Sequence, residues 1–232
     1  MIHQLINDDC FNHLSKINAD IVFTSPPYNR KRNDKYQSYE DTLDDYYMFL
    51  KRIINEVNYT KYLFLNVQAN YYNKTDVYKI IGEYASTIQQ IIIWNKHNPM
   101  PADGLNITNA YEFFIVFGNS PLKGNYTYTK NVLTTAVNSS TTTKIHKAVM
   151  KQEVADWFIV NFTSKGDTVL DPFMGVGTTG ISCVKYGRDF IGIEQSKQYY
   201  DIACQKLEET SEYISPQIEL GLIEEQNLFT LE

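Results

Sequence analysis

A glycine-rich loop lies between a predicted strand and a predicted helix, and it limits the folds that this chain can adopt. The run DPFMGVGTTG (171–180) follows a β-rich segment at 168–171 and precedes a helical pattern over about 178–187. Glycines at such a turn let the main chain approach a ligand closely, with the helix N–H groups pointing at it. The pattern therefore predicts either a nucleotide or nucleoside site or, as the structural alternative, a plain tight turn.

The rest of the chain alternates short β-rich runs with helical patterns, which indicates an α/β fold. We expect a Rossmann-like, mainly parallel sheet with helices on both faces. No internal repeat or interdomain linker is visible, so 1–232 is predicted to be a single domain. The predicted strands are 20–23, 62–67, 90–94, 113–117, 168–171 and 190–194, and the predicted helices are 41–58, 74–84, 147–162, 178–187 and 196–209.

Cysteine usage and hydropathy limit the cellular compartments in which the protein is expected. The cysteines Cys10, Cys183 and Cys204 are sparse and form no CxxC pair. This argues against a disulfide framework and a zinc ribbon, so we expect no metal site and a reducing, cytoplasmic compartment. The N-terminus lacks the pattern of a secretion signal, and no apolar run approaches 18 residues, so we expect no membrane association.

The formal net charge of −6 hides a strong asymmetry. From Asp201 onward the chain carries eight acidic residues and one basic residue, which leaves the first 200 residues close to neutral. Within those, 113–152 contains five lysines and no acidic residue, and a basic cluster lies at 30–35. Because local charge decides whether a phosphate backbone is attracted, an anionic partner is possible, although solvated surface explains each cluster equally well.

A second motif, TSPPYN (24–29), directly follows the strand predicted at 20–23. Its two prolines fix the backbone and leave carbonyl groups that can face a ligand. Ser25 adds a hydroxyl and Tyr28 an aromatic face. Taken alone, an ordinary proline-rich turn is as good an explanation, but the combination with the glycine loop favours a functional site.

The residues around the glycine loop distinguish two nucleotide hypotheses. Gly175, Gly177 and Gly180 match the dinucleotide pattern GxGxxG, and Glu194 ends the next predicted strand. A dinucleotide fold needs several further βα units, however, and only about 55 residues follow Gly177. Glu194 can accept both hydroxyls of one ribose. Asp171 suits a ligand with a cationic end, such as S-adenosylmethionine.

Together the motifs resemble those of the amino-group DNA methyltransferases, which modify the exocyclic amines of cytosine (N4) or adenine (N6). TSPPY is similar to the catalytic tetrapeptide (D/N/S)PP(Y/F), DPFMGVGTTG to the cofactor loop, and FIGIE (190–194) to the strand that carries the ribose-binding acid. The catalytic motif comes first, as in the β group of the family. The resemblance covers about 3–209 and includes Asp9, near the cofactor's adenine.

This resemblance implies direct methyl transfer from S-adenosylmethionine to a base flipped out of the duplex. The Ser25 hydroxyl and the Pro26 carbonyl would accept the two amine hydrogens, and Tyr28 would stack on the base. The implied catalytic residues are Ser25, Pro26, Pro27 and Tyr28. The implied cofactor-binding residues are Asp9, Thr24, Asp171, Pro172, Phe173, Gly175, Gly177, Thr178 and Glu194. The implied DNA-binding residues are Arg30, Lys31, Arg32, Lys144 and Lys147.

Target recognition is assigned to a small insertion at about 97–147, and an acidic tail begins at about 210. The expected partner is double-stranded DNA. A recognition region this small indicates a short site or help from a second subunit, and a restriction endonuclease partner is left open. The serine at position 25 resembles the cytosine-N4 branch, which we favour. Adenine N6, methylation of RNA or protein glutamine, an inactive nucleoside-binding module and an NAD-dependent oxidoreductase are the alternatives.

Overall fold

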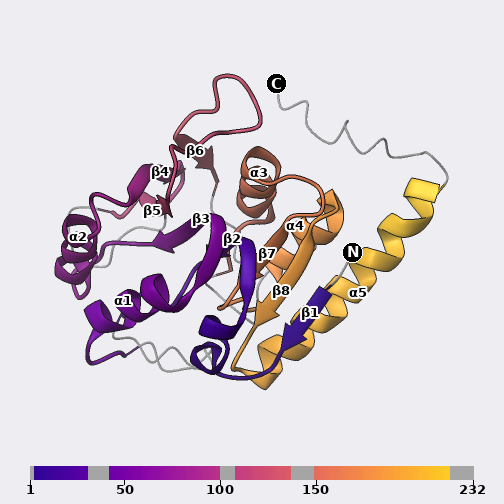
Figure 1. Cartoon of the computed structure of the whole chain (residues 1–232), viewed down its shortest axis with the longest axis horizontal. Coiled ribbons are helices and arrows are strands. Elements are labelled where there is room, and N and C mark those ends of the chain that lie inside the picture. Colours follow the sequence, from indigo (N-terminus) through magenta and orange to yellow (C-terminus); the bar gives the residue numbers. More distant parts are fainter. Residues whose placement is uncertain (1–2, 31–41, 100–107, 137–148, 220–232) are drawn as a thin grey trace.

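The structure is a computed structural model that describes residues 3–30, 42–99, 108–136 and 149–219 (Figure 1). The elements run, in chain order, β1 (His3–Ile6), η1 (Cys10–Asn12), η2 (Leu14–Lys16), β2 (Asn18–Thr24), α1 (Tyr46–Glu56), β3 (Asn58–Val67), α2 (Lys74–Glu83), β4 (Ile88–Lys96), β5 (Tyr111–Gly118), β6 (Val132–Thr135), α3 (Gln152–Phe162), β7 (Thr168–Asp171), α4 (Thr178–Tyr186), β8 (Asp189–Ile193) and α5 (Lys197–Glu219).

The described strands form one eight-stranded sheet in the order β1-β8-β7-β2-β3-β5-β4-β6. β5 pairs antiparallel with both β3 and β4, and the other pairs are parallel. The predicted mainly parallel α/β fold is therefore confirmed. Two short strands at the edges of the sheet, β1 and β6, were not predicted.

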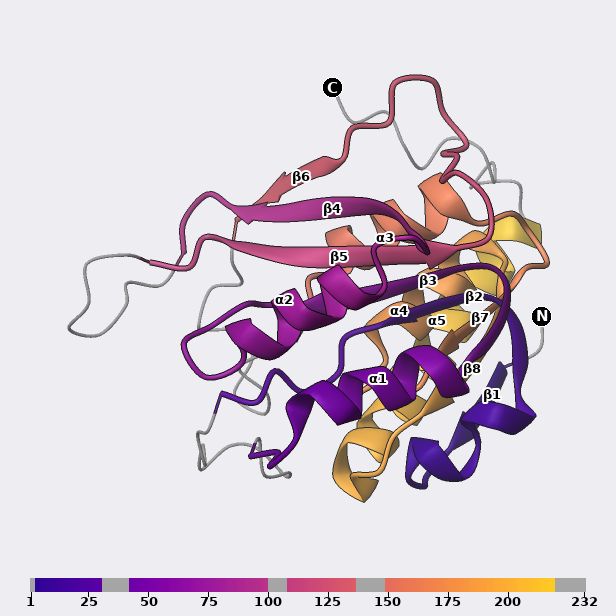
Figure 2. The same ribbon diagram turned by 60° about the vertical axis from the view of Figure 1, so that its left-hand side comes forward.

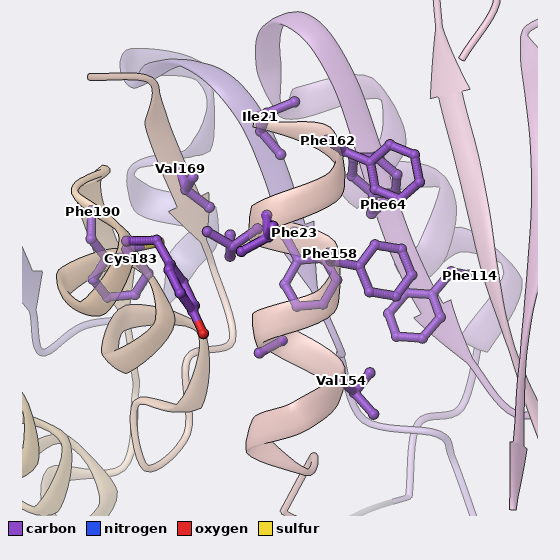
Figure 3. Close-up of a cluster of buried hydrophobic side chains, with 14 of the residues drawn as sticks. Ile21, Phe23, Phe64, Phe114, Val154, Phe158, Phe162, Val169, Cys183 and Phe190 are labelled. Carbon is purple, nitrogen blue, oxygen red and sulfur yellow. The ribbon is translucent and has the colours of Figure 1, made fainter. Parts of the chain in front are cut away.

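Helices cover both faces of the sheet (Figure 2). α1 and α2 pack on one face through residues such as Leu50, Ile53 and Val77. α3, α4 and α5 pack on the other, where Phe158 of α3 packs against both Phe23 and Phe114 (Figure 3). The ring centroid of Phe158 is 4.9 Å from that of Phe23 and 4.1 Å from that of Phe114. This aromatic core packs the strands β2 and β3 against α3, and so fixes the strands from which the next two loops begin.

Two predicted helix boundaries differ from the structure for local reasons. α1 begins at Tyr46 rather than near residue 41, because the Asp45 side chain accepts a hydrogen bond of 2.9 Å from the Met48 N–H and caps the helix there. α3 begins at Gln152, so Val149 and Met150, predicted to be helical, precede it. α5 continues to Glu219, past the start of the predicted acidic tail, whose remainder lies outside the described residues.

Candidate active site

The candidate site lies at the carboxyl edge of the parallel strands. β2, β3, β7 and β8 run in the same direction and end at Thr24, Val67, Asp171 and Ile193. A cavity of about 680 Å³ opens there, a volume typical of a small-molecule site. Of the predicted residues, Asp9, Ser25, Pro26, Pro27, Tyr28, Arg30, Asp171, Pro172, Phe173, Gly175, Thr178 and Glu194 line it.

The glycine loop approaches Glu194 through its main chain. The Gly175 N–H donates to Glu194 Oε2 at 3.0 Å, and the Ser196 N–H donates to Oε1 at 2.7 Å. Gly175 has a φ of +54° and borders the cavity, and a Cβ built on it meets no atom within 4 Å. Burial raises the pKa of the Glu194 carboxyl. The carboxylate is thus fixed by two donors, and each oxygen keeps a lone pair for a further hydroxyl group.

Two other glycines of the loop serve packing. Gly177 has a φ of +87°, and a Cβ there would lie 2.8 Å from the Leu207 side chain on α5. A Cβ on Gly180 would lie 2.6 Å from the Phe190 ring. Gly177 does not line the cavity. Its position among the predicted cofactor residues therefore reflects the tight approach of α4 to α5, not contact with the cavity.

Asp171 joins the two sequence motifs. Its carboxylate accepts hydrogen bonds from Thr24 Oγ1 (2.9 Å), the Phe173 N–H (3.1 Å) and Thr179 Oγ1 (2.6 Å). Asp171 is buried, and burial raises its pKa to about 6. Thr24 is fully buried and does not line the cavity. Thr24 therefore acts on the site by fixing Asp171, across 147 residues of chain.

An aromatic wall closes another side of the cavity. The Phe49 ring makes edge contacts with Phe11 and Phe173, with centroid distances of 5.8 and 5.7 Å. All three line the cavity and can enclose a planar base. Asp9 caps the turn that presents Phe11, accepting a hydrogen bond of 3.0 Å from its N–H. Burial raises the pKa of the neighbouring Cys10 thiol, so Cys10 lines the cavity as a neutral thiol.

Hydrogen bonds fix the proline turn to Asn66, a residue that the sequence analysis did not identify. Asn66, fully buried at the end of β3, donates from its amide to the Phe113 carbonyl at 3.0 Å, which fixes its oxygen toward the turn. That oxygen accepts from the Ser25 hydroxyl at 3.0 Å and from the Tyr28 hydroxyl at 2.5 Å. A polar residue within the apolar strand sequence LFLNV was the available signal.

Glu112 of β5 is a second unpredicted member of this network. It is buried, forms an ion pair with Lys96, and its Oε2 lies 2.9 Å from the Tyr28 hydroxyl, which can donate to it. The Tyr28 hydroxyl also lies 3.0 Å from the Ser25 hydroxyl, and it has one proton, so Asn66, Glu112 and Ser25 compete for it. Burial is the main cause that raises the Tyr28 pKa well above its usual value, with the Glu112 charge adding to it. Tyr28 therefore stays protonated.

Of the predicted DNA-binding residues, the structure describes only Arg30. Its guanidinium lies 5.2 Å from the centre of the Tyr28 ring and donates to Gln68 Oε1 at 3.1 Å. Lys31, Arg32, Lys144 and Lys147 lie outside the described residues. Val149 and Met150, just before α3, line the cavity.

The fold and the site together define the class of protein: a Rossmann-like α/β protein with a nucleoside-type site beside a polar proline turn. A family model for the N6 and N4 methyltransferases, described as DNA methylase, matches residues 19–205. The chain belongs to this DNA methylase family. The resemblance deduced from the two motifs is therefore confirmed, and so is the predicted class of enzyme, an S-adenosylmethionine-dependent DNA methyltransferase.

Individual relatives agree with this assignment. The chain is 24% identical to the Type II methyltransferase M2.DpnII of Streptococcus pneumoniae over 90% of each protein. Among solved structures, the M1.HpyAVI–SAM complex matches with a TM-score of 0.64 and 24% identity, over 89% of this chain and 100% of that one. The PvuII DNA methyltransferase (cytosine-N4-specific) matches with a TM-score of 0.68 and 18% identity, over 95% of this chain and 94% of that one. Within the described residues, no helix is both long and apolar enough to span a bilayer.

Proposed function

We propose that this protein transfers a methyl group from S-adenosylmethionine to cytosine N4 in double-stranded DNA. The observation that carries the proposal is the orientation of the Ser25 hydroxyl at the edge of the cavity. Because the Asn66 amide group donates to Phe113, its oxygen is the group that faces Ser25 and accepts the hydroxyl proton. The Ser25 oxygen is then left as an acceptor for one hydrogen of an exocyclic amine.

The lining of the cavity fits the cofactor. Glu194 offers two fixed acceptors for the ribose hydroxyls, and Phe11, Phe49 and Phe173 form an apolar wall for the adenine. A side chain at Gly175 would enter the open space beside Glu194, which explains why the loop has glycine there. When bound, the cofactor supplies an electrophilic methyl group on a sulfonium centre.

The residues of the turn position the amine for direct attack. An exocyclic amine is a poor nucleophile because its lone pair is delocalised into the ring. Hydrogen bonds to the Ser25 oxygen and to the Pro26 carbonyl favour a pyramidal nitrogen with an available lone pair. Much of the rate acceleration then comes from positioning. The Tyr28 ring, fixed through its hydroxyl, supports the flipped base.

Cytosine is favoured over adenine because the tetrapeptide begins with serine, as in the cytosine-N4 branch of the family. Target recognition is assigned to 97–147, apart from β5, which is paired on both sides within the sheet. The exposed Tyr126 and Tyr128 belong to the described part of that region. We also propose a role beside a restriction endonuclease, which the likeness to a Type II methyltransferase supports.

The test is mass spectrometry of nucleosides from unmethylated bacterial DNA treated with the protein and S-adenosylmethionine. We expect N4-methylcytosine, and a Ser25→Ala variant should form it at least tenfold more slowly while binding the cofactor normally. N6-methyladenine in its place would refute the cytosine assignment. Parallel reactions with labelled cofactor on RNA and on protein test the other substrate classes, and label there but not in DNA would refute the proposal.

A further inference from the structure

The loop that follows β3 exposes two adjacent tyrosines beside the proline turn. The Tyr71 and Tyr72 side chains are 78% and 57% exposed. Lys74 lies next to them, with its ammonium 5.7 Å from the centre of the Tyr71 ring, and 68–75 contains no acidic residue. The fold does not use these rings for its core, so their exposure calls for another explanation.

This loop is fixed to the proline turn by side-chain hydrogen bonds. The fully buried Asn73 donates from its amide both to the Tyr28 carbonyl at 2.6 Å and to the Gln68 carbonyl at 2.9 Å. Asn70 donates to the same Tyr28 carbonyl at 3.2 Å. The exposed rings are therefore presented at a fixed position relative to Tyr28, not on an independent surface.

The loop is also ordered internally, which lowers the entropic cost of binding. The Asn70 N–H donates to Asn73 Oδ1 at 2.7 Å, and the Tyr72 N–H donates to Asn70 Oδ1 at 2.8 Å. The two tyrosine rings meet edge to face, with their planes at 89° and centroids 5.3 Å apart. Such a pair presents rigid aromatic surface to a partner without further ordering of the backbone.

We propose that Tyr71 and Tyr72 stack on DNA bases that lose a neighbour when the target base leaves the duplex. The inference rests on the proposed function, since it takes duplex DNA as the substrate. Aromatic rings suit this partner because every base has a face on which they can stack, whatever its sequence. Lys74 adds a cation for the adjacent phosphate. The loop thereby contributes to extrusion of the base, whereas Tyr28 contacts the extruded base itself.

The experiment compares the wild-type chain with the variants Y71A/Y72A and Y71F/Y72F. Methyl transfer from tritiated S-adenosylmethionine to unmethylated bacterial duplex DNA gives KM and kcat, and fluorescence anisotropy with a labelled mixed-sequence duplex measures binding. Loss of stacking on an aromatic ring lowers affinity by roughly ten- to a hundredfold. We expect a rise of that size in KM for Y71A/Y72A, with unchanged cofactor affinity and thermal stability. Y71F/Y72F should stay within about twofold of wild type, because the rings remain.

Tyr213→Ala is the matched control, because Tyr213 is a tyrosine of similar exposure (68%) on α5, a helix that packs against α4 and β1. This variant should behave as wild type. Equal KM values and equal DNA affinities for Y71A/Y72A and wild type would overturn the inference. So would a parallel loss of cofactor affinity, or equal damage from Y71F/Y72F, since both indicate a structural role. Failure of the proposed function gives another result, because the wild-type chain itself would then transfer no methyl group to DNA. Anisotropy would still compare the DNA affinity of Y71A/Y72A with that of the wild-type chain.

Discussion

Replacing Asn66 by alanine should separate the support of the proline turn from cofactor binding. The substitution removes the Asn66 oxygen that accepts from the Ser25 hydroxyl and leaves that hydroxyl the Tyr28 oxygen at 3.0 Å, while Tyr28 keeps Glu112 as a partner at 2.9 Å. A hydrogen bond of this kind contributes about 0.5–1.5 kcal/mol, and an unsatisfied buried group costs about 1–3 kcal/mol. Without Asn66, the Ser25 proton can turn either to the Tyr28 hydroxyl, 3.0 Å away, or to the substrate amine, where it competes with the hydrogen that Ser25 should accept.

We therefore expect kcat for DNA methylation to fall about ten- to thirtyfold in Asn66→Ala, equivalent to about 1.4–2 kcal/mol. The affinity for S-adenosylmethionine, measured by calorimetry, should change by less than about twofold, because Asn66 does not line the cavity. The free energy of unfolding should fall by about 2–3 kcal/mol, since the Phe113 carbonyl loses its side-chain donor.

A double-mutant cycle with Ser25→Ala tests the route of the effect. If Asn66 acts through the Ser25 hydroxyl, its replacement should reduce kcat by less than about twofold once Ser25 is alanine. Two independent losses that multiply would refute the reasoning, because Asn66 would then act by another path. An unchanged kcat for a fully folded Asn66→Ala protein would refute it as well.

Three further predictions concern the cofactor loop. Glu194→Ala should weaken S-adenosylmethionine binding by about 1–3 kcal/mol in calorimetry, and unchanged affinity would remove Glu194 from the site. Asp171 has a pKa of about 6 in the folded state, above its value in the unfolded chain, so the folded state binds the proton more tightly. The stability that this proton contributes is present below about pH 4 and is lost as the pH rises to about 6, by about 3 kcal/mol. Urea unfolding across this range should therefore show a steeper fall for the wild-type chain than for Asp171→Asn, and parallel profiles would contradict this. Gly180→Ala places a Cβ 2.6 Å from the Phe190 ring and should lower the free energy of unfolding, measured by thermal unfolding, by about 1–3 kcal/mol. Gly82→Ala is the control: its Cβ would meet no atom within 4 Å, so it should not lower the stability of the protein.

Sequence patterns predicted the elements whose local signals agree with the fold. The strand predicted at 168–171 is β7 with the same bounds, and the helix after the glycine loop begins at Thr178 as predicted. β1 was missed because HQLI has a mixed burial pattern that resembles neither a buried nor an alternating strand. β6 (VLTT) has the same length as β7 but is more exposed, so it lacks the apolar run that marks a buried strand.

The candidate site was predictable where its residues share a motif and not where they meet by topology. Ser25, Tyr28 and Gly175 lie in contiguous runs, whereas Asn66 and Glu112 come from strands whose order in the sheet no local pattern specifies. Position within a motif also did not reveal side-chain direction. Thr24 was predicted to bind the cofactor, and in the structure its hydroxyl donates to the Asp171 carboxylate.

The order of strands has a consequence for synthesis of the protein on the ribosome. β2 is complete after residue 24, but its neighbour β7 is made about 145 residues later. Until then, the β2 edge that faces β7 has no partner, although the β2-β3-β5-β4 half can already pair. Unpaired edges of partly folded sheets invite association between chains. We therefore expect truncated chains that end before Thr168 to aggregate, and late closure of the central strand pair to limit the yield of soluble protein.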